Sequence, residues 1–169
     1  MLQLIDPTPD GGRISSGRPI LPDNVPTRAQ RRGGSLMTFP HLEFDQLNSL
    51  PFVSDGVRDM IEALEPAVHQ FLPVEVTGRD YVARRHILIV CNRLDTLHPT
   101  LTFPRNERGF YDGVIGKPHA IVHRANAIAG YHLWHEKYAQ GLFASDELVG
   151  RMLVTETSGL FVSDRHEAV

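Results

Sequence analysis

Leu50-Pro51-Phe52-Val53-Ser54-Asp55 opens the stretch of the chain that carries the clearest structural signal. Ser54 is a residue type favoured at helix N-caps, and Asp55 places a negative charge in the first helical turn. Apolar side chains follow at helical spacing, at Val57, Met60, Ile61 and Leu64. Pro66 disfavours helical geometry at the residue before it. The sequence therefore predicts a helix from Asp55 to about Glu65.

The same signal recurs at Phe143-Ala144-Ser145-Asp146. Ser145 would cap a second helix, and the acidic residues that follow it suit the positive end of the helix dipole. The apolar stripe of this helix is formed by Leu148, Val149, Met152 and Leu153. We expect a strand after each helix, at residues 71–76 and at Gly159 to Val162. The chain thus predicts two copies of a helix-then-strand unit.

Further strands lie between the two units. The run from Tyr81 to Cys91 is apolar enough for a central strand. Pro73 interrupts the preceding strand, which predicts an edge position or a late start for it. Shorter segments predict three more strands and one helical turn: Gly109 to Gly116, Ala120 to His123 and Tyr131 to His135 as strands, and Asn126 to Gly130 as the turn. Strands mixed with two separate helices indicate a single α+β domain with mixed or antiparallel strands.

The 169 residues fit one domain, because single domains commonly run to about 100–200 residues. Residues 1–35 hold five prolines and several glycines without apolar periodicity. We interpret them as an extended or disordered arm that forms neither a helix nor a central strand. Residues 36–169 would form the folded domain. The arm is either a tail without a role or a segment that closes over the domain.

Composition excludes several classes of protein. The first residues lack the basic flank and apolar run of a secretory signal. The longest uninterrupted aliphatic run, Ile87 to Cys91, is far shorter than the roughly 20 residues that cross a bilayer. The lone Cys91 has no partner for an internal disulfide, which suits a reducing compartment. We therefore expect a soluble cytoplasmic protein without a membrane partner.

The net charge of −3 is unevenly distributed. Residues 79–124 carry +4, but four acidic residues interrupt this block: Asp80, Asp95, Glu107 and Asp112. Nucleic-acid binding needs a concentrated basic face, so we expect no nucleic-acid ligand.

Residues 36–78 carry −6. Around the first predicted helix, only Arg58 opposes a set of acidic residues: Glu43, Asp45, Asp55, Asp59, Glu62 and Glu65. Asp59 and Glu62 fall on the helix side opposite the apolar stripe, so they should be solvated. The block either faces a basic partner or merely keeps the domain soluble.

A histidine group is the best candidate for chemistry: His119, His123, His132 and His135, beside Glu136. Imidazole is a common metal ligand, and the spacing of His119 and His123 would align two rings on a helix. On a strand the same spacing spans about 13 Å, too far for two ligands of one ion. We expect hydrogen-bonded or solvated histidines, with no metal and no cofactor.

Other catalytic patterns are weaker. A Cys91 nucleophile with His86 as its base would place the two side chains on opposite faces of a strand. The chain has no Gly-x-Ser-x-Gly elbow, and Val114 to Pro118 lacks the glycine spacing and hydroxyl residue of a phosphate loop. We expect no catalytic residue. Tyr131 and Trp134 are either exposed anchors for a partner or core residues.

Three phrases occur in a distinctive order: the one that opens at Leu50, then Phe71-Leu72-Pro73-Val74-Glu75-Val76, then Gly141-Leu142-Phe143-Ala144-Ser145-Asp146-Glu147-Leu148. In this order they resemble the eleventh immunity-protein family of bacterial polymorphic toxin systems. The resemblance covers roughly residues 49–162. One departure is Ala144, which stands where the first phrase has Val53. The resemblance implies that the chain neutralises a toxin by binding, without catalysis and without a cofactor.

The resulting hypothesis is an immunity protein in the cytoplasm of a toxin-producing bacterium. Its partner would be a cognate toxin encoded by an adjacent gene. We expect six residues at the contact: Glu43, Asp45, Asp59, Glu62, Tyr131 and Trp134. The alternatives are a small metal-dependent enzyme built on the histidine group, and a structural accessory module of a secretion or phage apparatus.

Overall fold

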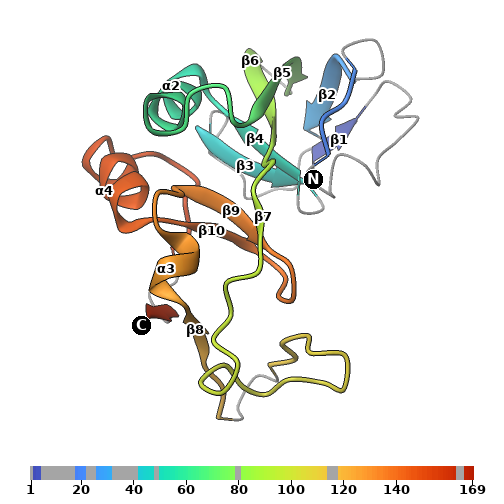
Figure 1. Ribbon diagram of the computed structural model, residues 1–169. Helices are drawn as coiled ribbons and strands as arrows, with labels where there is room; N and C mark the ends of the chain where they lie inside the picture. The colour runs from blue at the N-terminus through green and yellow to red at the C-terminus, as the bar shows by residue number, and fades with distance from the viewer. Residues whose placement is uncertain are drawn as a thin grey trace.

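The computed structural model describes residues 2–4, 18–21, 26–31, 42–47, 50–78, 81–113, 118–162 and 166–169. In these residues the chain forms three sheets and three helices, in an α+β arrangement with mixed sheets, which confirms the predicted fold class (Figure 1). The helices are α2 (Asp55–Leu64), α3 (Ala125–Ile128) and α4 (Asp146–Val154).

The largest sheet holds, in spatial order, β1 (Leu2–Leu4), β2 (Arg28–Arg31), β5 (Gln70–Thr77), β6 (Val82–Ile89), β4 (Leu50–Val53) and β3 (Phe44–Leu47). The second sheet holds β10 (Leu142–Ala144), β9 (Leu133–Glu136) and β7 (Arg93–Leu94), and the third pairs β11 (His166–Ala168) with β8 (Ile121–His123). Three pairs are parallel, namely β2 with β5, β7 with β9 and β8 with β11, and the other pairs are antiparallel.

Strand β6 is central, as predicted, because it pairs with β5 on one side and β4 on the other. Its side chains alternate between two separate apolar clusters. Ile87 and Ile89 pack with residues of β4 and β5, while Leu88 packs with α2, α4 and β9. A strand buried on both faces has no polar alternation, which explains the continuous apolar run in the sequence.

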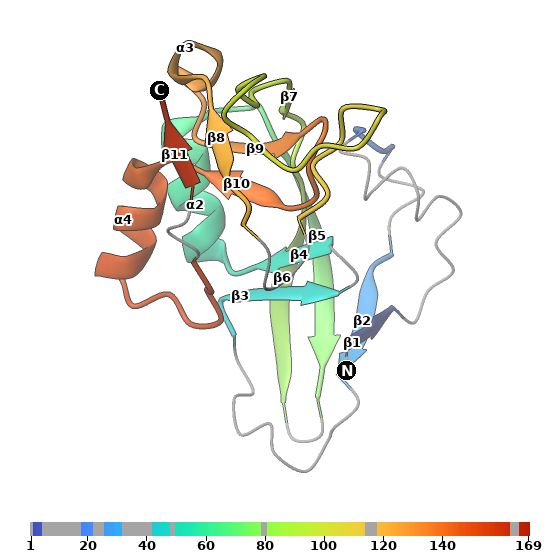
Figure 2. The same ribbon diagram turned by 90° about the horizontal axis from the view of Figure 1, so that it is seen from below.

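The two capped helices form as predicted. The Ser54 hydroxyl accepts a hydrogen bond from the Val57 N–H, and the Ser145 hydroxyl accepts one from the Leu148 N–H. α2 and α4 lie side by side (Figures 1 and 2) and share one apolar cluster. In this cluster α4 buries Leu148 and Met152, whereas Leu153 of the predicted stripe is exposed.

The repeated unit differs from the predicted one. Each helix follows a strand of an antiparallel pair, β3 with β4 and β9 with β10. The N–H of each cap serine extends that ladder: Ser54 donates to Glu43 O at 2.8 Å, and Ser145 donates to His132 O at 3.0 Å. The repeat is therefore strand, serine, helix, and both copies use the same register.

No strand forms at Gly159 to Val162, so the predicted second helix-then-strand copy is wrong. The Phe44 N–H donates to Ser158 O at 3.0 Å, which holds the chain after α4 against the start of β3. At Gly159, φ is +84° and a Cβ would lie 2.0 Å from Phe44 O. Only glycine fits this close crossing, which turns the chain away from a strand geometry.

Two other strand predictions need correction. Residues 109–113 form no strand, only an isolated bridge between Arg105 and Tyr111, and residues 114–116 lie outside the described part. β5 is not an edge strand, because β2 covers it. However, β2 pairs only with residues 75–77, so Pro73 lies in a part of β5 that β2 does not reach. The missing N–H of Pro73 is thereby tolerated.

The N-terminal residues contribute to the largest sheet. β1 and β2 both fall within residues 1–35, and Ala29 is fully buried. β2 lies between β1 and β5, which corrects the expectation that this segment could not supply an interior strand. Because most of residues 1–35 lie outside the described residues, the domain boundary at residue 35 stays a prediction.

A buried polar network joins the first sheet to the second. Glu65, at the end of α2, accepts hydrogen bonds from His69 Nε2 and Asn92 Nδ2, both at 2.8 Å. Asn92 also donates to Leu133 O of β9 at 2.9 Å. The Cys91 N–H donates to His69 Nδ1, which places the His69 proton on Nε2. We call Glu65, His69 and Asn92 the junction network.

We expect Ser54→Ala to lower the free energy of unfolding by about 0.5–2 kcal/mol, because the helix loses its cap acceptor. Ser145→Ala should cost at least as much, since the Ser145 hydroxyl also contacts His132 Nδ1 at 2.9 Å. Urea unfolding measures both changes, with the exposed Gln140→Ala as control. Unchanged stability in both serine variants would contradict the assigned caps.

Candidate functional site

The candidate site is the exposed face of α2. Asp55, Asp59 and Glu62 project from this helix, opposite Val57 and Ile61, which face the core. The side chains of Asp59 and Glu62 are 63% and 46% exposed. The predicted orientation of these two residues is therefore confirmed. We call Asp55, Asp59 and Glu62 the α2 acidic face.

Arg58 lies among these carboxylates. Its guanidinium nitrogens are 2.7 Å from Asp59 Oδ1, 3.3 Å from Asp55 Oδ1 and 3.7 Å from Glu62 Oε2. One guanidinium thus interacts with three carboxylates. The face keeps a net negative charge because the carboxylates outnumber the single cation. These exposed pairs hold the side chains in place but contribute little stability.

His86 of β6 contacts the same face from the side of the sheet. Its Nε2 donates to Asp55 Oδ1 at 2.6 Å, and this hydrogen bond lowers the pKa of Asp55. An Nε2 that donates to Asp55 has no lone pair left for Arg58, whose Nη1 lies 3.2 Å away. Arg58 therefore interacts with the carboxylates alone. The first turn of α2 is tied to the sheet through Asp55, whose side chain is still 66% exposed. Asp59 and Glu62 are the two carboxylates of this face that contact only Arg58 among the described residues.

The other acidic residues of the predicted block have structural contacts. The carboxylate of Glu43 accepts a hydrogen bond from the Ser158 N–H at 3.1 Å, and Asp45 accepts one from the Gln46 N–H at 2.8 Å. Both residues are half-buried. Glu65 belongs to the buried junction network and adds nothing to the surface charge.

The two aromatic candidates differ in exposure. Tyr131 is 39% exposed and follows the turn of α3. Trp134 is only 3% exposed, because its ring stacks on Phe143 with a centroid distance of 6.1 Å. Of the two interpretations considered for Trp134, the structure therefore supports a core residue and not an exposed anchor.

The four histidines of the metal hypothesis lie with different partners. His132 Nδ1 contacts the Ser145 hydroxyl, and His135 Nδ1 donates to Gly141 O at 2.9 Å. His123 contacts Thr96, and His119 is exposed beside Tyr111. Within the described residues, no three His, Cys, Asp or Glu side chains come close enough to hold one metal ion. That the chain needs no metal stays a prediction.

Cys91 does not face His86. It packs against the cluster formed by β4, β5 and β6, and burial raises the pKa of its thiol. A raised pKa reduces the thiolate fraction that a nucleophile needs. His86 instead serves Asp55. The pairing of these residues that we considered from the sequence is therefore not formed.

In a comparison with protein families, the model of the immunity protein family Imm11 matches residues 3–164 of the 169. The chain belongs to this family. The match extends the resemblance seen in residues 49–162 through the N-terminal segment that carries β1 and β2. Neither the curated proteins nor the solved structures gave a match.

Membership of an immunity protein family implies a toxin as partner and a role that is generally non-catalytic. In this immunity protein, no helix among the described residues is long and apolar enough to cross a membrane.

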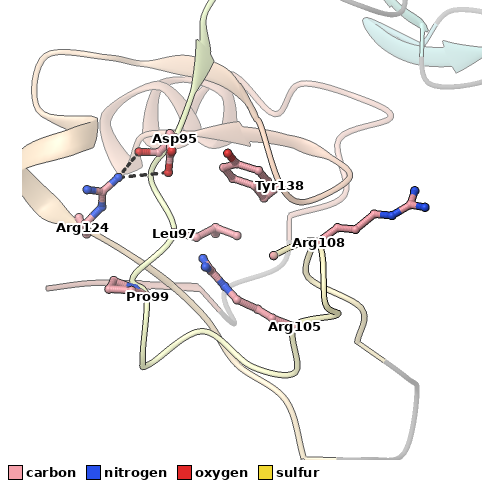
Figure 3. A pocket seen from close by; sticks show the side chains of 8 residues that line it. Asp95, Leu97, Pro99, Arg105, Arg108, Arg124 and Tyr138 are labelled. Atoms are coloured by element: carbon pink, nitrogen blue, oxygen red, sulfur yellow. Dashed lines mark hydrogen bonds and ion pairs between the residues drawn. The ribbon is translucent and has the colours of Figure 1, made fainter.

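The sequence did not reveal a second feature of this immunity protein, a recess between the loop that follows β7, the start of α3 and the segment that follows β9. Its lining includes Arg105, Arg108 and Arg124 (Figure 3). These arginines come from the block whose interleaved acidic residues argued against a basic face. Their placement around one recess depends on the path of the loop, which charge spacing does not encode.

A second buried network involves His123. Thr96 Oγ1 donates to Glu136 Oε2 and therefore accepts from His123 Nδ1, at 2.6 Å. His123 Nε2 is buried without a partner among the described residues. Burial, helped by the charge of nearby His166, lowers the pKa of His123 from 6.5 to about 4. The neutral ring is thus the form that fits the folded protein.

We expect the immunity protein to lose stability as the pH falls from 6.5 towards 4. In this window the unfolded chain binds the His123 proton and the folded chain does not, so protonation favours unfolding. His123 alone accounts for about 3 kcal/mol at most. Burial also lowers the pKa values of His135 and His166, which act in the same direction.

Urea unfolding at several pH values from 7.5 to 4.5 measures this loss. His123→Asn keeps a donor near the Nδ1 position and should flatten the curve, whereas His119→Asn controls for the removal of an exposed imidazole. A wild-type stability that rises as the pH falls through this window would contradict the assignment of a neutral His123.

Proposed function

We propose that this immunity protein neutralises a cognate toxin by direct, non-catalytic binding, in the cytoplasm of a bacterium that makes the toxin. The observation that carries the proposal is the family match over residues 3–164. The toxin would be encoded by a gene adjacent to the one for this chain. Binding is tighter when the contact surface is already ordered in the free protein.

The α2 acidic face supports this proposal as a contact surface. Its carboxylates are exposed, and they are fixed on a helix whose other side packs against α4 and β6. A rigid acidic surface attracts a basic partner and speeds its association. Tyr131 offers further exposed aromatic area. Trp134 is left out of the proposed surface because it is buried.

Stoichiometry separates a binding inhibitor from an enzyme that destroys or modifies the toxin. The toxin domain from the adjacent gene is assayed with increasing amounts of this protein. A binding inhibitor blocks toxicity only when it reaches an equimolar ratio, whereas a catalyst protects at much lower ratios over time. Protection at a small fraction of the toxin concentration would contradict the proposal.

We expect the double variant Asp59→Lys, Glu62→Lys to associate with the toxin about tenfold more slowly, or worse, at low salt. The physical reason is repulsion between the new lysines and a basic partner. Stopped-flow or surface-binding kinetics at low and moderate salt measure the on-rate, and the difference from wild type should shrink as salt rises.

The matched control is Glu156→Lys, Glu167→Lys, which makes the same charge change at two exposed residues outside α2. Melting temperatures of both double variants must stay near that of wild type. If the α2 variant and the control associate equally fast, the α2 acidic face is not the contact.

A further inference from the structure

The arginine recess lies in a different part of the molecule from the α2 acidic face. Figure 1 places α2 at one end and the long loop after β7 at the other. The recess has a volume of about 350 Å³. Its lining is formed by three arginines, one acidic residue, one tyrosine, two apolar residues and a glycine: Arg105, Arg108, Arg124, Asp95, Tyr138, Leu97, Pro99 and Gly109 (Figure 3).

The recess carries more positive than negative charge. Arg124 Nη2 lies 3.2 Å from Asp95 Oδ1 and also donates to Asp95 O, so one cation and one anion are paired. Within the described part of the chain, Arg105 and Arg108 have no carboxylate partner. The lining therefore has two more cationic than anionic groups. Glu107 and Asp112 belong to the same loop but do not line the recess.

Two of the guanidinium donors are buried and unused. The Nε atoms of Arg105 and Arg124 are both shielded from solvent, and neither has a hydrogen-bond acceptor among the described residues. A buried donor on a cationic group without an acceptor costs more than a neutral one. In Figure 3 the Arg105 side chain points towards Leu97, into the recess. An oxyanion seated there would supply the missing acceptor.

The shape of the recess indicates whether that oxyanion belongs to a free small molecule or to a partner protein. Sites for free small molecules bury about 70–90% of their ligand. Here the rim is open, because Arg108 and Pro99 are exposed and the side chains of Asp95 and Arg124 are 52% and 41% exposed. A small free ligand would remain largely in water. A side chain held by a protein, whose surface closes the open side, would be desolvated on docking.

We propose that the arginine recess binds a carboxylate side chain of the cognate toxin. This inference rests on the proposed immunity function and adds a second, oppositely charged contact to it. Arg105 would bind the carboxylate, while Asp95 holds Arg124 in position. The exposed Arg108, whose side chain extends away from Arg105 in Figure 3, would add positive charge at the rim. The partner that fits both surfaces carries a basic area for the α2 acidic face and an exposed Asp or Glu for the recess.

The first experiment needs no toxin. Inorganic phosphate and glutarate, a simple dicarboxylate, are titrated separately into the free protein at low salt, and the arginine Nε–Hε signals are followed by NMR. We expect saturable shifts of the Arg105 and Arg124 signals at millimolar anion, and at least fivefold weaker binding in Arg105→Gln. Signals that respond no more than they do to equal ionic strength of chloride would overturn the proposal.

The second experiment measures toxin association by Arg105→Gln and, separately, Arg108→Gln. Neither side chain makes a hydrogen bond or ion pair among the described residues, so both variants should keep the wild-type melting temperature. We expect Arg105→Gln to weaken toxin binding about tenfold or more, and Arg108→Gln to weaken it less. Arg151→Gln, which removes an arginine on α4, is the control.

The two experiments distinguish an error in the recess proposal from an error in the proposed immunity function. If wild type binds the toxin but Arg105→Gln and Arg108→Gln bind it as tightly as Arg151→Gln does, the toxin does not use the recess and the proposal is overturned. If wild type does not bind the toxin, the proposed immunity function is wrong, and so is the proposed binding of a toxin carboxylate. In that case the anion titration still shows whether the recess itself takes an oxyanion.

Discussion

The buried carboxylate of Glu65 is the constraint on which the rest of the structure depends. A buried carboxylate needs hydrogen-bond partners, and both of its oxygens have one, His69 at Oε2 and Asn92 at Oε1. Asn92 reaches on to Leu133 O, so the end of α2, the start of β5, the exit of β6 and the second sheet meet at one point. The apolar cluster shared by α2, α4 and β6 closes around this point. The exposed side of α2 therefore keeps a fixed orientation.

Local signals made the helices predictable, whereas the strands around them depend on distant partners. Ser54 and Ser145 satisfy donors three residues away, so their role is visible in the sequence. β4 and β10 were missed because each is short and is defined by its pairing with β3 or β9. The segment after α4 was wrongly predicted as a strand, since the close crossing of Gly159 over Phe44 is a tertiary contact.

The candidate site was predictable to a similar extent. Helical spacing placed Asp59 and Glu62 on the solvent side of α2. Glu65, which we counted in the same acidic block, is buried instead, because the junction network draws its side chain inwards at the end of the helix. The recess was hidden for another reason: Arg105 and Arg124 are brought to one recess by a loop, and the acidic residues between them in the sequence do not line it. Charge counted along the chain does not equal charge on a surface.

The central claim is that two oppositely charged surfaces on one rigid scaffold bind the toxin. Hydrogen exchange measured by mass spectrometry, for this protein alone and in complex with its toxin, tests it most directly. We expect slower exchange on binding in two segments, residues 55–64 and residues 105–111, with little change in β1 and β2. Protection confined to other segments, with both of these unchanged, would contradict it.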